Sequence, residues 1–100
     1  MTAVEPNLLE WLSLSQPSPN PFHTAMTATL WLPSERLVRA FVADCSGRRV
    51  RSLVAERRSG TLEIAWDGSR DDGEPAGPGL YFLYVRAGRA QLVRKLALTP

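Results

Sequence analysis

Apolar and polar residues alternate along most of the chain, the period of two that indicates β-strands with one buried and one exposed face. In the segment 26–32 every second residue is apolar: Met26, Ala28, Leu30 and Leu32. The segment 36–44 places Val38, Ala40 and Val42 on one face in the same way. Strands are also predicted at Trp11–Ser15, Arg48–Ala55, Thr61–Trp66, Leu80–Arg86 and Gln91–Leu98. No segment shows the period of about 3.6 residues expected of a helix.

Turn-forming residues separate these strands. Asp44-Cys45-Ser46-Gly47 predicts a hairpin turn, and Ala87-Gly88-Arg89 predicts a second one between the last two strands. Pro33 and Ser34 are expected to end a strand, and Glu56–Gly60 to form a polar turn. Asp67–Gly79 is rich in glycine, proline and aspartate, so this segment predicts a loop.

Three prolines, Pro17, Pro19 and Pro21, follow the first predicted strand. Proline has no backbone N–H to donate, so this run cannot belong to a central strand or to a helix interior. We expect an extended crossover that ends where Phe22 fills an apolar gap in the core.

The strands and turns together predict the fold. About seven short strands with turns at regular spacing are typical of an all-β domain, either an immunoglobulin-like antiparallel β-sandwich or a small barrel. A chain of 100 residues has room for one such core. We assign residues 11–98 to the domain and residues 1–10 to a leader or linker.

Composition narrows the classes of function. Acidic residues nearly balance the basic ones, so the net charge of +2 does not indicate nucleic acid as a partner. The sequence has no signal peptide and no apolar run long enough for membrane insertion. An extracellular or cell-surface location is therefore expected only if the chain belongs to a longer secreted precursor.

Few residues suggest catalysis or a cofactor. His23 is the only histidine and Cys45 the only cysteine, so neither a zinc site nor a histidine-assisted nucleophile is indicated, and we predict no enzyme and no cofactor. Asp67, Asp71 and Asp72 are weak calcium candidates, because carboxylates on a flexible turn can surround a hard cation. The same residues are what tight turns require, and we favour that interpretation.

Arginines and aromatic residues could form contact surfaces. On a strand, part of a cluster of arginines could line one face as a phosphate-binding stripe, although a solvated edge is the interpretation we favour. That cluster comprises Arg48, Arg49, Arg51, Arg57 and Arg58. Trp66, Tyr81 and Phe82 are predicted to lie in the core. If Trp11 and Trp31 are exposed together, they mark a surface for a neighbouring domain or a second copy.

Five short motifs occur in order: Pro19-Asn20-Pro21-Phe22, Asp44 with Gly47-Arg48-Arg49-Val50, Trp66-Asp67-Gly68, Gly79-Leu80-Tyr81-Phe82 and Arg94-Lys95-Leu96. Their order and spacing resemble the type A C-terminal sorting domains of the type nine secretion system. They also resemble the immunoglobulin-like domain of FlgD, the flagellar hook-capping protein. The resemblance implies a β-sandwich at the end of a large secreted protein, recognised by an outer-membrane translocon.

The resemblance also implies roles for these residues. The motif residues are expected to be mainly structural, and Arg94, Lys95 and Leu96 are candidates for a sorting contact. The leading hypothesis is a non-catalytic domain that export machinery recognises for secretion or surface attachment. The alternative is an assembly module like the hook-capping domain. In both cases the partners are proteins, and a homo-oligomer is compatible with the second.

Overall fold

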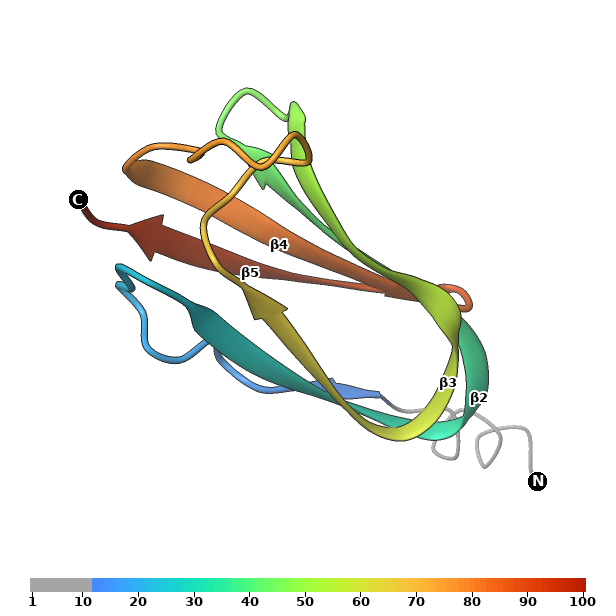
Figure 1. Cartoon of the computed structure of the whole chain (residues 1–100). Coiled ribbons are helices and arrows are strands. Elements are labelled where there is room, and N and C mark those ends of the chain that lie inside the picture. Colours follow the sequence, from blue (N-terminus) through green and yellow to red (C-terminus); the bar gives the residue numbers. More distant parts are fainter. Residues whose placement is uncertain (1–11) are drawn as a thin grey trace.

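The computed structural model describes residues 12–100, and every regular element among them is a β-strand. The strands are β1 (Ser13–Leu14), β2 (Met26–Asp44), β3 (Arg49–Trp66), β4 (Gly79–Ala87) and β5 (Ala90–Leu98). All strand pairs are antiparallel, in the order β1-β2-β4-β5, with β3 also paired to β2 (Figure 1). The part of the chain described contains no helix that could cross a membrane.

The long strands β2 and β3 bend together, so that one sheet folds into two layers (Figure 1). The first half of β2 pairs with β1 and with the second half of β3. The second half of β2 pairs with β4 and with the first half of β3. A register shift between Leu32 and Arg36 marks the bend. The predicted immunoglobulin-like sandwich is therefore confirmed, with five continuous strands.

Two predicted breaks in the strands were wrong. Pro33 and Ser34 do not end a strand, and residues 56–60 are not a turn, because β2 and β3 run through both segments. The pairing resumes beyond the bend at Arg36 and Arg58. A strand irregularity can accommodate proline because the local pairing is already interrupted there. Each of the seven predicted strands still has a counterpart, because β2 and β3 each join two of them into one continuous strand.

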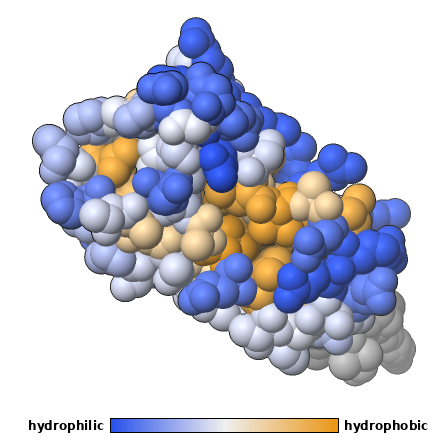
Figure 2. Space-filling model, viewed as in Figure 1, coloured by the Kyte–Doolittle hydropathy of each residue, from blue (hydrophilic) through white to orange (hydrophobic). Residues whose placement is uncertain are grey.

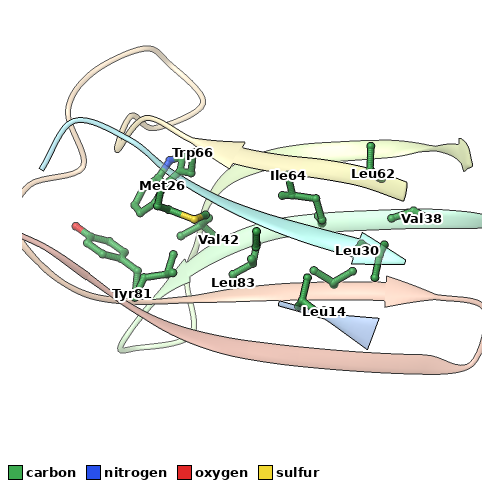
Figure 3. Close-up of a cluster of buried hydrophobic side chains, with 14 of the residues drawn as sticks. Leu14, Met26, Leu30, Val38, Val42, Leu62, Ile64, Trp66, Tyr81 and Leu83 are labelled. Atoms are coloured by element: carbon green, nitrogen blue, oxygen red, sulfur yellow. The ribbon is translucent and has the colours of Figure 1, made fainter. Parts of the chain in front are cut away.

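The core lies between the two layers (Figure 3). The inward positions predicted from the alternation are all buried, from Met26 to Leu32 on one layer and from Val38 to Val42 on the other. Leu83, Val85 and Leu96 close the core from β4 and β5. Burying one such side chain contributes about 1.5–3 kcal/mol, so these residues dominate the stability of the fold.

The proline-rich crossover covers the edge of β5. Phe22 N donates to Ala97 O at 2.9 Å, and Thr99 N donates to Phe22 O at 2.8 Å. The amide of Asn20 donates to Lys95 O at 2.9 Å and accepts from Ala97 N at 3.0 Å. The peptide bonds before Pro19 and Pro21 are cis. Phe22 is 1% exposed, which confirms that it fills a gap in the core.

Candidate protein-interaction surface

Three aromatic residues from separate motifs form the inner aromatic cluster: Phe22, Trp66 and Tyr81. The Trp66 ring meets Phe22 edge-on at 5.5 Å between centroids, and meets Tyr81 edge-on at 5.1 Å. The indole Nε1 donates to Ser69 O at 2.8 Å, which satisfies its only polar group. The prediction that Trp66 and Tyr81 belong to the core is confirmed.

Tyr81 also fixes the loop that precedes β4. Its hydroxyl lies 2.6 Å from Gly77 O and 2.8 Å from Ala76 O, the two carbonyls that accept its proton. Burial raises the pKa of the Tyr81 phenol above its ordinary value, because the charged form would lose hydration. Gly79 of the same motif begins β4. Tyr81 is therefore a structural residue.

Asp44 closes the hairpin between β2 and β3. Its Oδ1 accepts from Ser46 Oγ at 2.7 Å, and from the backbone N–H groups of Ser46 and Arg48, each at 3.0 Å. The bond from the Ser46 hydroxyl is the main reason that the pKa of Asp44 is lowered. Gly47 has φ of +88°, a conformation that glycine adopts without strain. The motif around Asp44 thus encodes a turn.

Asp67 closes a similar turn after β3. Its Oδ1 accepts from Ser69 Oγ at 2.6 Å and from Ser69 N at 3.0 Å, and the hydroxyl bond is the main cause of its lowered pKa. Gly68 has φ of +84°, and a Cβ there would lie 3.3 Å from the Leu98 side chain. The positive φ therefore favours glycine, and an added Cβ would also press against the Leu98 side chain of β5.

The aspartates of the 67–79 loop make separate contacts. Asp71 Oδ1 accepts from Ser52 N at 2.9 Å, which fixes the loop to the edge of β3, whereas Asp72 Oδ1 accepts from Glu74 N at 2.9 Å. Among residues 12–100, no group of three or more histidine, cysteine or acidic side chains could hold a metal ion. Asp67 and Asp72 therefore make the local contacts of turn residues, whereas Asp71 joins the loop to β3.

The three candidates for a sorting contact differ in their surroundings. Leu96 lies in the core and is 0% exposed. Arg94 points across the sandwich, where its guanidinium donates to Leu14 O of β1 at 2.6 Å. Lys95 is exposed. A partner of the folded domain therefore meets Lys95 more readily than its two neighbours.

The clustered arginines do not form a stripe. Arg51 donates to Ser69 Oγ and to Arg70 O, each at 3.0 Å, so it holds the loop after β3. Ion pairs join Arg57 to Glu35 and Arg58 to Glu56. Arg48 is exposed beside the hairpin turn, whereas Arg49 covers an aromatic ring on β2. The five arginines are close together in the sequence, but in the fold their side chains make separate contacts.

The remaining single candidates lie at the surface. Cys45 is an exposed free thiol in the predicted turn, 3.4 Å from Leu80 O. His23 Nδ1 lies 3.1 Å from Pro100 O. Trp31 is 48% exposed and is paired with Ser13 of β1. Trp11, the proposed companion of Trp31, lies outside the described residues, as does the predicted leader or linker of residues 1–10.

The outward side of β2, β4 and β5 carries a second set of aromatic residues. Phe41 pairs across the sheet with Tyr84, and Tyr84 pairs with Val93, so these side chains form one row. Phe82 and Lys95 lie in the next row. We call these residues, with Arg39, Arg49 and Arg86, the outer aromatic face. Phe82 was predicted to lie in the core, which was wrong, because its neighbours Tyr81 and Leu83 take the inward positions.

A hollow lies in this face around Phe41. The rings of Phe41 and Tyr84 stack at 5.1 Å with 11° between their planes. The guanidinium carbon of Arg49 lies 3.9 Å from the Phe41 centroid, and that of Arg86 lies 5.4 Å away. Arg39 also lines the hollow. We call this site the arginine pocket. The strict alternation around the inward residues Ala40 and Val42 was the sequence signal that could have placed Phe41 outside.

A second hollow lies between the two halves of β3. It is lined by Ala25, Arg51, Leu53, Ala65, Trp66 and Asp67. Leu53 and Val54 are only partly buried where they pack against the core from this strand. Figure 2 shows hydrophobic residues exposed in the middle of the molecule, bordered by hydrophilic ones. The sandwich thus has apolar surface outside the arginine pocket as well.

Comparison with known proteins places this arrangement in a family. A family model of the FlgD Ig-like domain matches residues 25–91, well over half of the chain. The chain belongs to the FlgD Ig-like domain family. Such small β-domains are typically non-catalytic. The match spans the hairpin turn at Asp44, the turn at Asp67 and most of both aromatic sets, but it begins after the proline-rich crossover and ends before Arg94.

Among solved structures, this FlgD Ig-like domain is similar to dimeric latent PorU from Porphyromonas gingivalis, with a TM-score of 0.65 and 23% sequence identity. The match covers 89% of this chain and 9% of the PorU chain. At this identity the similarity shows the fold, and the domain corresponds to a small part of PorU. No curated protein matches the chain.

Proposed function

We propose that this FlgD Ig-like domain is a non-catalytic accessory domain through which export machinery recognises a larger protein for secretion or attachment to the cell surface. The observation that carries the proposal is the outer aromatic face, where the half-buried Phe82 and Tyr84 and the arginines over the 8% exposed Phe41 face away from the core. Aromatic residues and arginine are enriched at protein interfaces. The resemblance of the five sequence motifs to type A sorting domains supports the choice of the type nine system.

The position of β5 determines how a partner would recognise the domain. Leu96 is buried, Arg94 is bonded to β1, and the crossover covers the strand edge near Ala97. A partner that needed β5 as a free peptide would have to break these contacts. We therefore infer recognition of the folded sandwich, with Lys95 as the exposed part of the last motif.

A secretion assay tests this proposal. The full chain is fused to the C-terminus of a signal-bearing reporter, in a host with a type nine secretion system, and surface reporter is measured. We expect display by the unaltered fusion, loss of most display with Lys95→Glu, and retention with Lys95→Arg. Leu96→Ala, which removes a core side chain, shows what a loss of folding does in the same assay.

The outcomes distinguish the sorting role of the domain from the specific contact through Lys95. Reporter that stays in the periplasm with the unaltered domain contradicts a sorting role. Full display with Lys95→Glu contradicts the contact through Lys95. Measuring the unfolding of each purified variant identifies any loss of display that comes from a destabilised domain.

The alternative proposal is an assembly module in which the sandwich packs against other subunits. The match of residues 25–91 to the FlgD Ig-like domain favours it, because the hook-capping protein FlgD is the example on which this alternative is based. Sedimentation velocity of the full chain tests the simplest form, self-association. A mass that rises with concentration supports it, and Trp31→Ser, at an exposed position, is expected to lower that association. A strictly monomeric chain contradicts self-assembly.

A further inference from the structure

The arginine pocket concentrates positive charge that the described residues do not neutralise. Three of its lining residues are arginines, Arg39, Arg49 and Arg86, and none of its lining residues is acidic. Within residues 12–100, the side chains of Arg39 and Arg49 donate no hydrogen bond and form no ion pair. By contrast, Arg57 and Arg58 each have a glutamate partner. The pocket is therefore complementary to a negative group.

Two of these arginines are held in place before any ligand arrives. Arg49 rests on the Phe41 ring at 3.9 Å, and Arg86 donates from Nε to Gln91 Oε1 at 2.7 Å. Stacking on an aromatic ring leaves the edge of a guanidinium available for hydrogen bonding. A planar guanidinium edge matches a carboxylate, which it can bind through two parallel hydrogen bonds.

The surroundings of the pocket indicate what carries the carboxylate. Tyr84 stacks against Phe41, and Phe82 and the 39% exposed Val93 continue the outer aromatic face beside it. A free small anion would use the arginines and leave this apolar surface uncovered. A protein segment with acidic and aromatic side chains would contact both. Acidic residues nearly balance the basic ones, so the net charge of +2 for the whole chain does not by itself indicate nucleic acid as the partner.

We propose that the arginine pocket binds an aspartate or glutamate side chain of a partner protein, within an acidic segment whose aromatic or apolar residues cover Phe82, Tyr84 and Val93. The inference rests on the proposed function in that the partner is a protein. It adds the chemistry of the contact: guanidinium to carboxylate at the centre, with apolar contacts around it.

Titration of the purified full chain with a defined peptide tests the inference. The probe is a peptide of alternating glutamate and tyrosine, and its control alternates glutamine and tyrosine. Binding is followed by NMR through the arginine Nε–Hε signals. We expect those of Arg49 and Arg86 to shift, and the glutamine peptide to bind about tenfold more weakly, which is the loss of one charge-assisted hydrogen-bonded contact.

Variants locate the site. Arg49→Gln and Arg86→Gln are each expected to weaken binding of the glutamate peptide by about tenfold. The matched control is Arg57→Gln, which removes an exposed arginine of β3 that already has Glu35 as its partner. Added salt should weaken the binding, because exposed charges are screened.

Several results would overturn the inference: no binding of the glutamate peptide, equal binding of both peptides, or an equal loss in Arg57→Gln. Tighter binding of inorganic phosphate or of a single-stranded oligonucleotide, with shifts of the same arginine signals, would reassign the pocket to phosphate groups. The secretion assay is independent of these measurements. Peptide binding without display rejects the sorting role alone, and display without peptide binding rejects the pocket alone.

Discussion

The domain has two sets of three aromatic residues, which differ in the geometry of their ring contacts and in the side chains that cover them. In the inner aromatic cluster, Trp66 meets Phe22 and Tyr81 edge-on between the layers. On the outer aromatic face, Phe41 and Tyr84 stack in parallel, and Phe82 lies in the neighbouring row. Arg49 and Arg86 of the arginine pocket lie over the Phe41 ring. The inner rings are covered by other core residues, and Phe41 is covered by charged side chains.

This difference separates stability from recognition. Tyr81 and Phe82 are consecutive residues of one motif, yet Tyr81 belongs to the inner aromatic cluster and Phe82 to the outer aromatic face, because side chains alternate between the two faces of a strand. The inner set joins the crossover, the end of β3 and the start of β4, so its removal should affect the whole fold. The outer set lies on one layer only, so changes there should alter binding more than folding.

The largest expected effect is on the inner aromatic cluster. Trp66→Ala removes a side chain that is 1% exposed and leaves a cavity between Phe22 and Tyr81. We expect the free energy of unfolding to fall by about 3–5 kcal/mol, the usual cost of deleting a large buried aromatic side chain. Urea unfolding followed by circular dichroism measures it. A loss below about 1 kcal/mol would show that the cluster does not hold the layers together.

A smaller effect distinguishes the two tyrosines of β4. Tyr81→Phe deletes the hydroxyl that reaches the carbonyls of Ala76 and Gly77, and should lower the unfolding free energy by about 1 kcal/mol. Tyr84→Phe is the matched control, because the Tyr84 hydroxyl has no hydrogen bond within residues 12–100. We expect that control to change stability by less than about 0.5 kcal/mol. Equal effects of both variants would contradict the structural role of the Tyr81 hydroxyl.

The comparison also explains what could be predicted from sequence. The alternation at Met26–Leu32 identified the inner face correctly, because a period of two depends only on local backbone geometry. The bend could not be predicted in the same way. Pro33 and the polar residues 56–60 are normal signs of a strand end, and only the pairing between two distant segments keeps them in β2 and β3.

The candidate site was harder to predict than the fold. The arginines were recognised as a group along the sequence, whereas the arginine pocket combines Arg49 of β3 with Arg39 of β2 and Arg86 of β4. Their proximity depends on the register of three strands, which one sequence does not specify. Phe82 was assigned to the core because it lies in the most apolar predicted strand, although the inward positions of its neighbours Tyr81 and Leu83 place it on the outward side. The residue types could be recognised along the sequence, but which of them come together from different strands could not be predicted.

A still smaller effect is expected on the outer aromatic face. Arg49→Gln removes the cation that lies 3.9 Å from the Phe41 ring, and should lower the unfolding free energy by about 0.5–1 kcal/mol, the value of an exposed cation–π contact. Urea unfolding of the full chain measures this change. A loss as large as that of Trp66→Ala would mean that the outer face also supports the fold, and would remove the distinction between the two sets.

The smallest expected effect is the loss of unfolding free energy at low pH, which we expect from the turn carboxyls and not from the outer aromatic face. The pKa values of Asp44 and Asp67 are lowered from their ordinary value in the fold, mainly by the hydrogen bonds from the hydroxyls of Ser46 and Ser69. A carboxyl with a lowered pKa stabilises the folded state above its unfolded pKa, and this contribution is lost as pH falls through the folded value. Asp67 closes the turn beside Trp66.

The expected result is therefore a decrease in unfolding free energy between pH 7 and pH 3 that is smaller in the double variant Asp44→Asn and Asp67→Asn. Asparagine keeps an oxygen that can accept the turn hydrogen bonds, but it does not titrate. Arg49→Gln, the control on the outer aromatic face, should show the same decrease as the unaltered chain. Urea unfolding at the two pH values measures all three proteins. An undiminished decrease in the double variant would assign the acid sensitivity to other carboxyls, and the two turns would then not link the inner aromatic cluster to pH.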